Sequence, residues 1–530
     1  MMKRIALWLV YALLVVLPLR AEVTPGSPFT NHMVLQREMK VPVWGTAASG
    51  EHVTVAFAGQ KKTVTAGADG SWRVDLDPME ASAEGRVMTL SGSATAQPVQ
   101  LEDVLVGEVW LASGQSNMTF PISKAHAPYA GVNNEEGEIA AANYPLIRMF
   151  MGKPTLAHEP GSRVEGDWKV CNPENAPDFS AVGYFFSRDL QKEIHVPIGI
   201  LVVAFGASTA EAWIPREALA ADPQLKPMLD NFDSLYAAFQ ANPEAQAKLA
   251  EDQKKYEAVV AEAKAKGVRP PKGPGDPNPV HNQHNPTVLY NGMVHPVQPY
   301  AIRGAIWYQG ESIVGKVAGR TLYPRVQETL IKEWRKRWGE GDFPFFIVQL
   351  AALNMPSNSP QVREAQATVL KLPDTGMAVT IDIGDPTNVH PKDKQDVGDR
   401  LKRIAMAKVY GGKDEYSGPV YDAMKVEGGA IRVSFTHVGG GLVAKDGPLK
   451  WFEVAGADMK FVPADAKIDG EAVVVSSAQV ASPVAVRYAW ANYPVGCNLY
   501  NAAGLPAAPF RTDHEPYQEA PPANAPAKGM

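Results

Sequence analysis

A serine and a histidine suited to nucleophilic catalysis follow two strand-like segments of this sequence. The segment Gly-Gln-Ser-Asn-Met at 114–118 comes directly after the apolar run 109–112, which has the length and composition of a buried parallel strand. A serine hydroxyl is a poor nucleophile until a nearby base takes its proton, and His390 can be that base. His390 follows a second apolar run, 377–383, and a loop, so both residues are predicted at the edge where open α/β sheets bind ligands. The pair predicts acyl transfer with Ser116 as the nucleophile.

The identity of an acid that would orient His390 is open. Asp385 is the first candidate, Asp382 is the second, and a Ser-His pair without an acid is the third alternative. The serine segment is not the Gly-x-Ser-x-Gly elbow of the α/β-hydrolases, because position 118 is Met. A purely structural interpretation also stands, since Gly, Gln, Ser and Asn suit an ordinary turn.

Acyl transfer also needs hydrogen-bond donors aimed at the developing oxyanion. Gly206 follows the strand-like run 201–204, and its lack of a side chain lets a backbone N–H approach a substrate. Gln309 follows another such run, 302–308, and its amide can donate a hydrogen bond while staying uncharged. Both residues are candidate oxyanion donors.

The segments that must position these residues alternate between strand-like and helical patterns over 102–415. Apolar residues recur at helical spacing in 323–338 and in 400–410. This alternation predicts a parallel sheet covered by helices on both faces. A segment at about 216–284, with strong helix formers over 242–266, interrupts the alternation and predicts a helical insertion, either a rim or lid of the site or a solvated excursion. The strand-like runs are 109–112, 146–151, 198–205, 302–308, 345–350 and 377–383.

The flanking segments have a different pattern. Residues 22–101 and 416–514 contain short alternating runs separated by turn residues, which predicts a β-sandwich module at each end, and the second module could pack on the first. Residues 515–530 are rich in Pro and Ala and predict a disordered tail. Residues 1–21 have a basic start and an apolar run over 5–17, which predicts a secretory signal peptide, with an uncleaved anchor as the alternative. The mature protein is therefore expected to be exported, periplasmic or secreted, and free of the membrane after signal cleavage.

Composition narrows the classes of partner. The net charge is only −6 over 530 residues and there is no long basic run, which argues against nucleic acid as a partner. The two cysteines, Cys171 and Cys497, lie far apart in the sequence and could pair or remain separate thiols. The Cys and His spacings do not match a zinc site, and the serine chemistry requires neither a metal nor an organic cofactor.

Five motifs occur in one order in this sequence. They are Gly-Gln-Ser-Asn-Met at 114–118, Gly-Ala-Ser at 206–208 with Glu-Ala-Trp at 211–213, Leu-Tyr-Asn-Gly-Met-Val-His-Pro at 289–296, Trp-Tyr-Gln-Gly-Glu-Ser at 307–312 and Val-His-Pro at 389–391. Together they closely resemble the sialate O-acetylesterase family within the SGNH-type hydrolases. The resemblance continues through Arg-Tyr-Ala-Trp at 487–490 and Asn-Leu-Tyr-Asn at 498–501, so it covers nearly the whole mature chain. The first and fourth motifs are specific, whereas the glycine motif is weak.

The resemblance implies a serine esterase that removes O-acetyl groups from sialic acids, with the 9-O-acetyl ester favoured, through an acetyl-enzyme on Ser116. It implies His390 as the base, and an oxyanion hole formed by the N–H groups of Ser116 and Gly206 with the Gln309 side chain. Many SGNH-type enzymes place an acid three residues before the histidine, where this sequence has Thr387. The expected fold is an SGNH-like α/β/α parallel-sheet domain between N- and C-terminal β-sandwich modules.

The expected partner is an O-acetylated sialic acid or sialoglycan. Five residues are candidates for lining the substrate pocket, although packing is an equal alternative for the two tryptophans. Two other functions stay open: an acetylesterase acting on another glycan such as acetyl-xylan, and a non-catalytic glycan-binding protein on an esterase scaffold. The candidate lining residues are Trp213, His295, Trp307, Tyr308 and Glu311.

Overall fold

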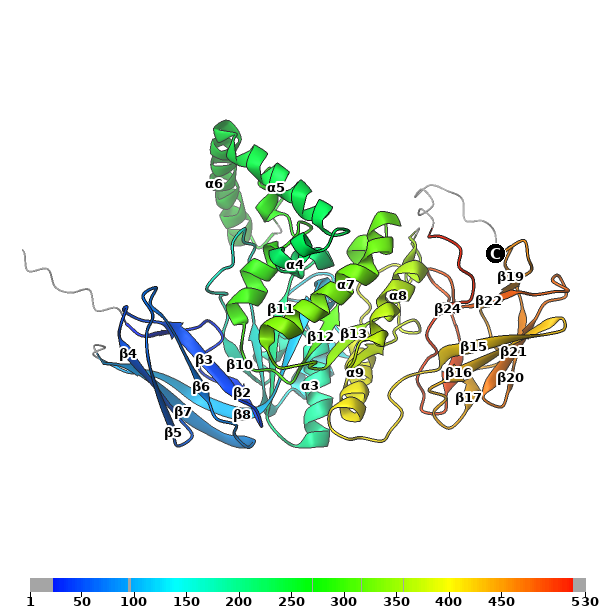
Figure 1. Cartoon of the computed structure of the whole chain (residues 1–530), viewed down its shortest axis with the longest axis horizontal. Coiled ribbons are helices and arrows are strands. Elements are labelled where there is room, and N and C mark those ends of the chain that lie inside the picture. The colour runs from blue at the N-terminus through cyan, green and yellow to red at the C-terminus, as the bar shows by residue number, and fades with distance from the viewer. Residues whose placement is uncertain (1–21, 94–96, 269, 316, 356, 518–530) are drawn as a thin grey trace, which may run out of the picture.

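The structure is a computed structural model that describes residues 22–93, 97–268, 270–315, 317–355 and 357–517. The predicted signal peptide lies outside the described residues, as does most of the predicted tail. A layered α/β region forms the middle of the molecule, and strand-rich regions lie at its two ends (Figure 1).

The central sheet has the strand order β10-β9-β11-β8-β12-β13-β14. Neighbouring strands from β9 to β14 are parallel, and only the edge strand β10 is antiparallel to its neighbour. A strand forms at each of the predicted apolar runs, although β14 ends at Ala378 and most of the run 377–383 lies beyond it, and the central sheet is mixed. Its strands are β8 (Val99–Gly114), β9 (Tyr144–Met151), β10 (Trp168–Cys171), β11 (Ile198–Ala204), β12 (Gly304–Tyr308), β13 (Phe345–Val348) and β14 (Thr375–Ala378).

Helices cover both faces of this sheet. Side chains alternate along each strand, so each strand presents apolar residues to both faces and helices bury them there. In β8, Trp110 packs in the same buried cluster as residues of α3 (Ala181–Ile194) and α9 (Lys394–Lys408). The next residue, Leu111, belongs to the other cluster, with residues of α7 (Val317–Trp338) and α8 (Ser359–Ala367). The predicted helix at 323–338 is thus part of α7, and the one at 400–410 overlaps α9, which ends at Lys408; the two lie on opposite faces.

The N-terminal strands are continuous with the central sheet through β8. The first half of β8 pairs with β7 and β2, and its second half pairs with β11 and β12. β1, β3 and β6 form a separate three-stranded sheet. These strands are β1 (Thr24–Pro25), β2 (Val34–Gln36), β3 (Val41–Thr46), β4 (His52–Phe57), β5 (Gln60–Thr65), β6 (Ser71–Leu76) and β7 (Ser82–Gly92).

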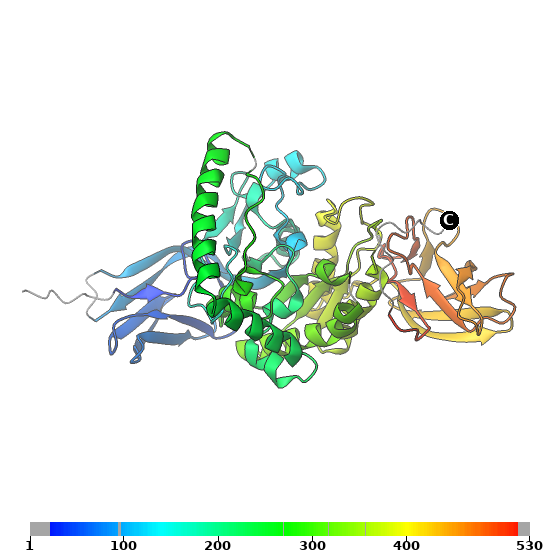
Figure 2. The ribbon, with the colours of Figure 1, turned by 90° about the horizontal axis from the view of Figure 1, so that it is seen from above.

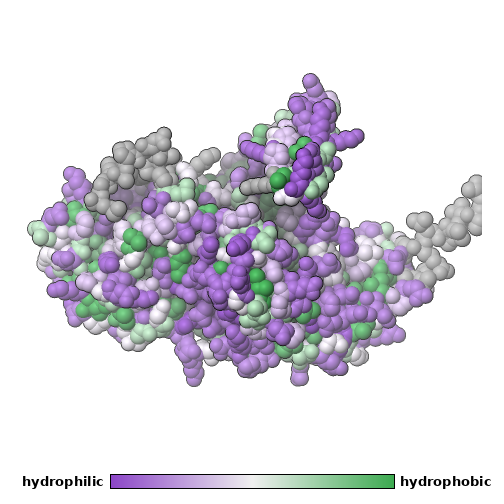
Figure 3. Space-filling view, turned by 180° about the vertical axis from the view of Figure 1, so that it is seen from behind, coloured by the Kyte–Doolittle hydropathy of each residue, from purple (hydrophilic) through white to green (hydrophobic). Residues whose placement is uncertain are grey.

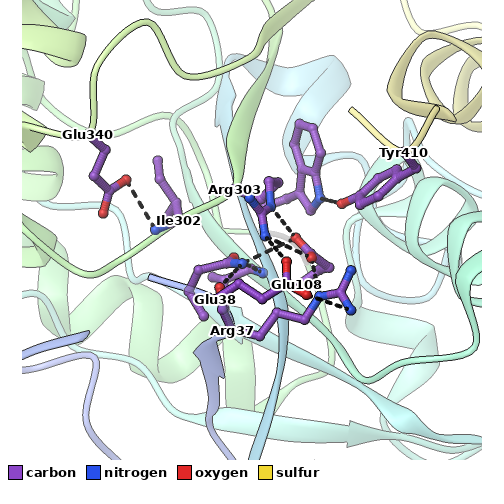
Figure 4. Close-up of polar contacts among 10 residues, drawn as sticks. Arg37, Glu38, Glu108, Ile302, Arg303, Glu340 and Tyr410 are labelled. Carbon is purple, nitrogen blue, oxygen red and sulfur yellow. Dashed lines mark hydrogen bonds and ion pairs between the residues drawn. The ribbon is translucent and has the colours of Figure 1, made fainter. Parts of the chain in front are cut away.

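A buried carboxylate on β8 links the N-terminal strands to the central sheet. Glu108 is fully buried, and it accepts hydrogen bonds from Arg37 and Arg303 (Figure 4). Arg37 directly follows β2, and Arg303 directly precedes β12. A buried charge is tolerated when it is paired and hydrogen-bonded in this way.

The predicted insertion is helical and projects from the body of the molecule (Figures 1 and 3). It contains α4 (Arg216–Ala221), α5 (Lys226–Gln240) and α6 (Pro243–Ala265). Along α6 only Leu249 and Ala263 are buried, which fits the largely hydrophilic surface of this arm. The arm is therefore stabilised mainly by helix propensity and by the packing of α5.

The C-terminal strands lie at the end of the molecule opposite to β1–β7 (Figures 1 and 2). The expectation that the two strand-rich regions pack on each other is therefore wrong. The physical reason is that the N-terminal region is fastened to β8, whereas the chain leaves the sheet through the edge strand β14 and α9. These strands are β15 (Val420–Glu427), β16 (Ala430–Thr436), β17 (Leu442–Ala444), β18 (Phe452–Ala455), β19 (Val462–Pro463), β20 (Asp465–Asp469), β21 (Ala472–Ser476), β22 (Ala485–Tyr488), β23 (Leu499–Asn501) and β24 (Phe510–Arg511).

Short helices complete the chain. They are α1 (Ser116–Thr119), α2 (Glu135–Ala140), η1 (Ala176–Asp178), η2 (Ala210–Trp213), η3 (Pro279–His281), η4 (Tyr290–Val294), η5 (His295–Val297), η6 (Glu311–Ile313) and η7 (Thr368–Lys371).

The two cysteines, Cys171 and Cys497, are both buried and free. Within the described ranges, the structure contains no helix with the length and apolarity to span a bilayer.

Candidate active site

Ser116 is the first residue of α1 and follows the tight turn that ends β8, at the carboxyl end of the parallel strands. The preceding Gly114 has φ +133°, and a Cβ atom there would lie 2.1 Å from the carbonyl oxygen of Tyr308. Only glycine therefore lets β8 and β12 approach so closely at this point. The Gln115 N–H donates to the same Tyr308 oxygen at 2.9 Å, which ties the serine turn to the end of β12.

The structure brings Ser116 and His390 together. The Nε2 atom of His390 lies 2.8 Å from the Ser116 hydroxyl oxygen, although the two residues are 274 positions apart. Burial, and secondly the positive charge of Lys394, lower the pKa of His390 to about 4. The imidazole is therefore neutral at pH 7, the state in which a ring nitrogen can accept the serine proton.

Backbone and ring contacts hold His390 in this position. Its N–H donates to the side-chain oxygen of Asn388 at 2.9 Å, and the carbonyl of Val389 accepts from the Asn117 amide at 3.0 Å. The imidazole packs against the ring of Tyr129, with centroids 4.5 Å apart. Asn117 directly follows the serine, so one side chain links the serine turn to the histidine loop.

Neither predicted acid contacts His390. A single oxygen of Asp385, Oδ1, accepts from the Thr387 N–H at 2.7 Å, the Thr387 hydroxyl at 3.0 Å and the Asn388 N–H at 2.8 Å. These bonds lower the pKa of Asp385 and shape the loop rather than the imidazole. Among all described residues, no carboxylate is hydrogen-bonded or ion-paired to His390.

Asp382, the second candidate acid, is engaged by other partners. Arg400 donates to both of its carboxylate oxygens at 2.7 Å, and the Tyr500 hydroxyl donates to one of them at 3.0 Å. Bidentate pairs of this kind are among the stronger polar contacts in proteins. The geometry therefore matches the third alternative, a Ser-His pair without an acid.

A buried polar network behind the serine was not foreseen from the sequence. Lys394, at the start of α9, is fully buried, and its ammonium donates to the Asn117 amide oxygen at 2.7 Å. The Asn117 amide nitrogen donates to Glu311 Oε1 at 2.5 Å. Burial lowers the pKa of Lys394 to about 7 and raises that of Glu311, and each charge partly offsets the other. Asn117 is in the serine motif, but a lysine four residues after a histidine gives no signal in a sequence.

The predicted oxyanion donors follow β11 and β12, the two strands that flank the serine strand β8. A Cβ atom at Gly206, just after β11, would lie 3.7 Å from the Ser116 Cβ, so this backbone runs beside the serine. Gln309, just after β12, is fully buried; its Oε1 accepts from the Tyr323 hydroxyl at 2.8 Å and its Nε2 donates to the Ser208 carbonyl at 3.1 Å. The bond to the Ser208 carbonyl, which can only accept, fixes which end of the amide carries the donors.

Four of the five predicted lining residues have other surroundings. Trp213, Trp307 and Tyr308 are each at most 1% exposed, and the two indole rings pack edge to face with centroids 6.0 Å apart. His295 contacts the Gly161 carbonyl at 2.9 Å. These residues stabilise the fold around the site. They do not line the cavity beside the serine.

Glu311 does line that cavity, which has a volume of about 300 Å³. Its second carboxylate oxygen, Oε2, is buried and has no hydrogen-bond partner among the described residues. A largely apolar cavity with a few polar side chains is suited to a small ligand. The described residues contain no cluster of three or more His, Cys, Asp or Glu placed to hold a metal ion. The lining residues are Asn117, Glu311, Val314, Leu350, Ala351, Ala352, Leu353, Met355, Ser357, Ser359, Asn388, Val389 and Pro391.

Comparison with known proteins places this site in a family. Residues 279–406 match the family model described as carbohydrate esterase, sialic acid-specific acetylesterase. The crystal structure of a carbohydrate acetylesterase from Xanthomonas citri superposes with a TM-score of 0.78 at 34% sequence identity, covering 93% of this chain and 100% of that one. The chain belongs to the sialate O-acetylesterase family of carbohydrate esterases. It is accordingly a carboxylic ester hydrolase.

Mammalian members of the sialate O-acetylesterase family align with nearly the whole chain. The sialate O-acetylesterase of Mus musculus is 29% identical, with 92% of this chain and 93% of the mouse protein covered. That of Homo sapiens is 28% identical, with 92% and 91% covered. The family-model match includes Gln309, Glu311, His390 and Lys394, whereas Ser116 comes from the part of the chain before it.

Proposed function

We propose that this protein hydrolyses O-acetyl esters of sialic acids by a serine mechanism that passes through an acetyl-enzyme. The observation that carries the mechanism is the 2.8 Å contact between His390 Nε2 and the Ser116 hydroxyl. The substrate class rests on the family to which the chain belongs. The serine after the central strand β8 and the histidine after β14 fit an SGNH-type hydrolase. The apolar N-terminal segment supports an exported enzyme.

The reaction starts with Ser116 Oγ attacking the acetyl carbonyl carbon while His390 Nε2 takes the hydroxyl proton. The N–H groups of Ser116 and Gly206 and the Gln309 amide donate to the oxyanion that forms. His390 then gives its proton to the departing sugar oxygen, which leaves the acetyl group on Ser116. Water attacks this acetyl-enzyme with His390 again as the base, and acetate is released.

A histidine without an acid depends on packing for its orientation. In this proposal the Tyr129 ring and the backbone bonds at Asn388 and Asn117 restrict the imidazole. The Glu311 carboxylate lies in the same network as Lys394, and it offsets the lysine charge that disfavours an imidazolium.

The proposal is tested by measuring acetate release from three substrates side by side. The substrates are 9-O-acetyl-N-acetylneuraminic acid, acetyl-xylan and 4-nitrophenyl acetate. We expect the sialic acid ester to give the highest kcat/KM, and Ser116→Ala or His390→Ala to abolish turnover of all three. A preference for acetyl-xylan would reassign the sugar and keep the chemistry. Full activity of Ser116→Ala would overturn the serine mechanism, and no wild-type activity would indicate a glycan-binding role.

A further inference from the structure

A second cavity, of about 400 Å³, lies between the central sheet and the C-terminal region. Asp382 and Gly384 line one wall and come from the loop after β14, at the same edge of the sheet as Ser116. The opposite wall comes from the segments that follow β17 and precede β23. Ala352 lines this cavity as well as the cavity beside the serine, so the two are neighbours. The lining residues are Ala352, Ile381, Asp382, Gly384, Lys445, Asp446, Lys450, Tyr493, Pro494, Val495, Gly496, Cys497, Asn498 and Tyr500.

Two lysines on the C-terminal wall hold their ammonium groups at this cavity. The Lys445 Nζ lies 5.0 Å from the centroid of the Tyr500 ring. The Lys450 Nζ lies 3.7 Å from the position that a Cβ would take at Gly496. No ion pair found in the described ranges includes either lysine, although both line the cavity.

The negative charges of the cavity do not neutralise these lysines. Asp382 is bound by Arg400, which also pairs with Asp396 at 3.1 Å, through two hydrogen bonds of 2.7 Å and by the Tyr500 hydroxyl, so its oxygens are already engaged. Asp446 is exposed at the rim and forms no ion pair within the described residues. The groups that can contact a ligand in this cavity are therefore two unpaired ammonium groups, tyrosine rings and one carboxylate at the rim.

We propose that this cavity binds the carboxylate of an acidic sugar of the substrate glycan. The assignment rests on the proposed function, because the acidic sugar would belong to the substrate that the neighbouring esterase site hydrolyses. Ammonium groups attract a sugar carboxylate, and Tyr493 offers a ring and a hydroxyl to the rest of the sugar. A cleft between two regions of a chain, at the carboxyl edge of its parallel strands, is a common place for a ligand.

The first experiment separates charge recognition from chemistry. KM is measured for 9-O-acetyl-N-acetylneuraminic acid and for the uncharged 4-nitrophenyl acetate at low ionic strength. Each of Lys445→Met and Lys450→Met is expected to raise the ratio of the charged to the neutral KM about two- to fivefold, and the double variant about tenfold, which is the range for exposed ion pairs. Asp446→Asn should lower the ratio, and added salt should weaken every effect.

Lys460→Met is the matched control, because Lys460 is an exposed lysine of the same region that does not line the cavity. We expect it to leave both KM values unchanged. Lysine variants whose KM ratio equals that of the wild type, or an equal rise with both substrates, would overturn the cavity assignment.

The second experiment keeps the assignment testable if the protein does not hydrolyse sialic acid esters. Binding of N-acetylneuraminic acid, glucuronic acid and glucose to the Ser116→Ala variant is measured by calorimetry. Binding of an acid but not of glucose, lost in the Lys445→Met/Lys450→Met variant, would support the cavity even where the proposed substrate fails. Absence of acid binding by the Ser116→Ala variant would overturn it.

Discussion

Replacing Asp385 by asparagine distinguishes a Ser-His pair from a triad. In the structure one oxygen of Asp385, Oδ1, accepts three hydrogen bonds from Thr387 and Asn388, and none of its bonds reaches His390. Asparagine keeps an acceptor oxygen at this place and removes the charge. The loop that holds His390 should therefore keep its shape, while any carboxylate that served the imidazole would be lost.

The expected loss is small. A hydrogen bond to a charged group stabilises a protein by about 1 kcal/mol more than one to a neutral group. If all of that difference reached the transition state, kcat/KM of the Asp385→Asn variant would fall about fivefold. Loss of an acid that orients a catalytic histidine instead lowers turnover about 10⁴-fold. The two interpretations are thus separated by about three orders of magnitude.

Release of 4-nitrophenol from 4-nitrophenyl acetate gives the rate, and circular dichroism shows whether the variant is folded. Asp382→Asn is the companion variant: it weakens the pair with Arg400, so we expect a lower melting temperature with less than tenfold loss of turnover. A folded Asp385→Asn protein that has lost 10³-fold or more in kcat/KM would refute the Ser-His pair. It would show that the loop rearranges to bring Asp385 to the imidazole.

Three further outcomes follow from the same geometry. The pKa of His390, lowered to about 4, predicts that kcat/KM stays level from neutral pH down to about 5 and falls as pH drops through about 4, because protonation removes the base; a pH–rate profile checks this. Lys394→Met removes the positive charge that disfavours the imidazolium, so the acid limb of that profile should move to higher pH; an unmoved limb would contradict it. Gln309→Ala should lower kcat about 10²–10³-fold with little change in KM if its amide donates to the oxyanion, and full activity on 4-nitrophenyl acetate would exclude that role.

The proximity of Ser116 and His390 could be predicted from the sequence, because it follows from the topology of a parallel sheet. Parallel strands end at the same edge of a sheet, so residues after β8 and β14 come within reach whatever the intervening sequence is. The helices at 323–338 and 400–410 could likewise be predicted, because apolar residues at helical spacing form one continuous face only in a helix. These features depend on periodicity, which a single sequence contains.

The orienting acid could not be read from the sequence, because several donors compete locally for each aspartate. The Thr387 and Asn388 N–H groups satisfy Asp385, and Arg400 reaches Asp382 from a helix on the sheet face. The Lys394 network was invisible for a related reason: its partner Asn117 lies 277 residues away. Its existence depends on how closely α9 packs against the serine turn.

The C-terminal region contributes to the catalytic site through its contact with one buried arginine. Arg363 of α8 is fully buried and donates to the carbonyls of Leu350 and Ala351 at 2.9 and 3.0 Å, and to those of Ala491 and Asn492 at 2.8 and 2.9 Å. Burial lowers its pKa to about 9, and the bound carbonyl oxygens stabilise the guanidinium. The first two carbonyls belong to the wall of the cavity beside the serine, and the last two to the C-terminal region. The same side chain therefore ties the wall of the cavity beside the serine to the C-terminal region, so that region is part of the framework of the esterase site.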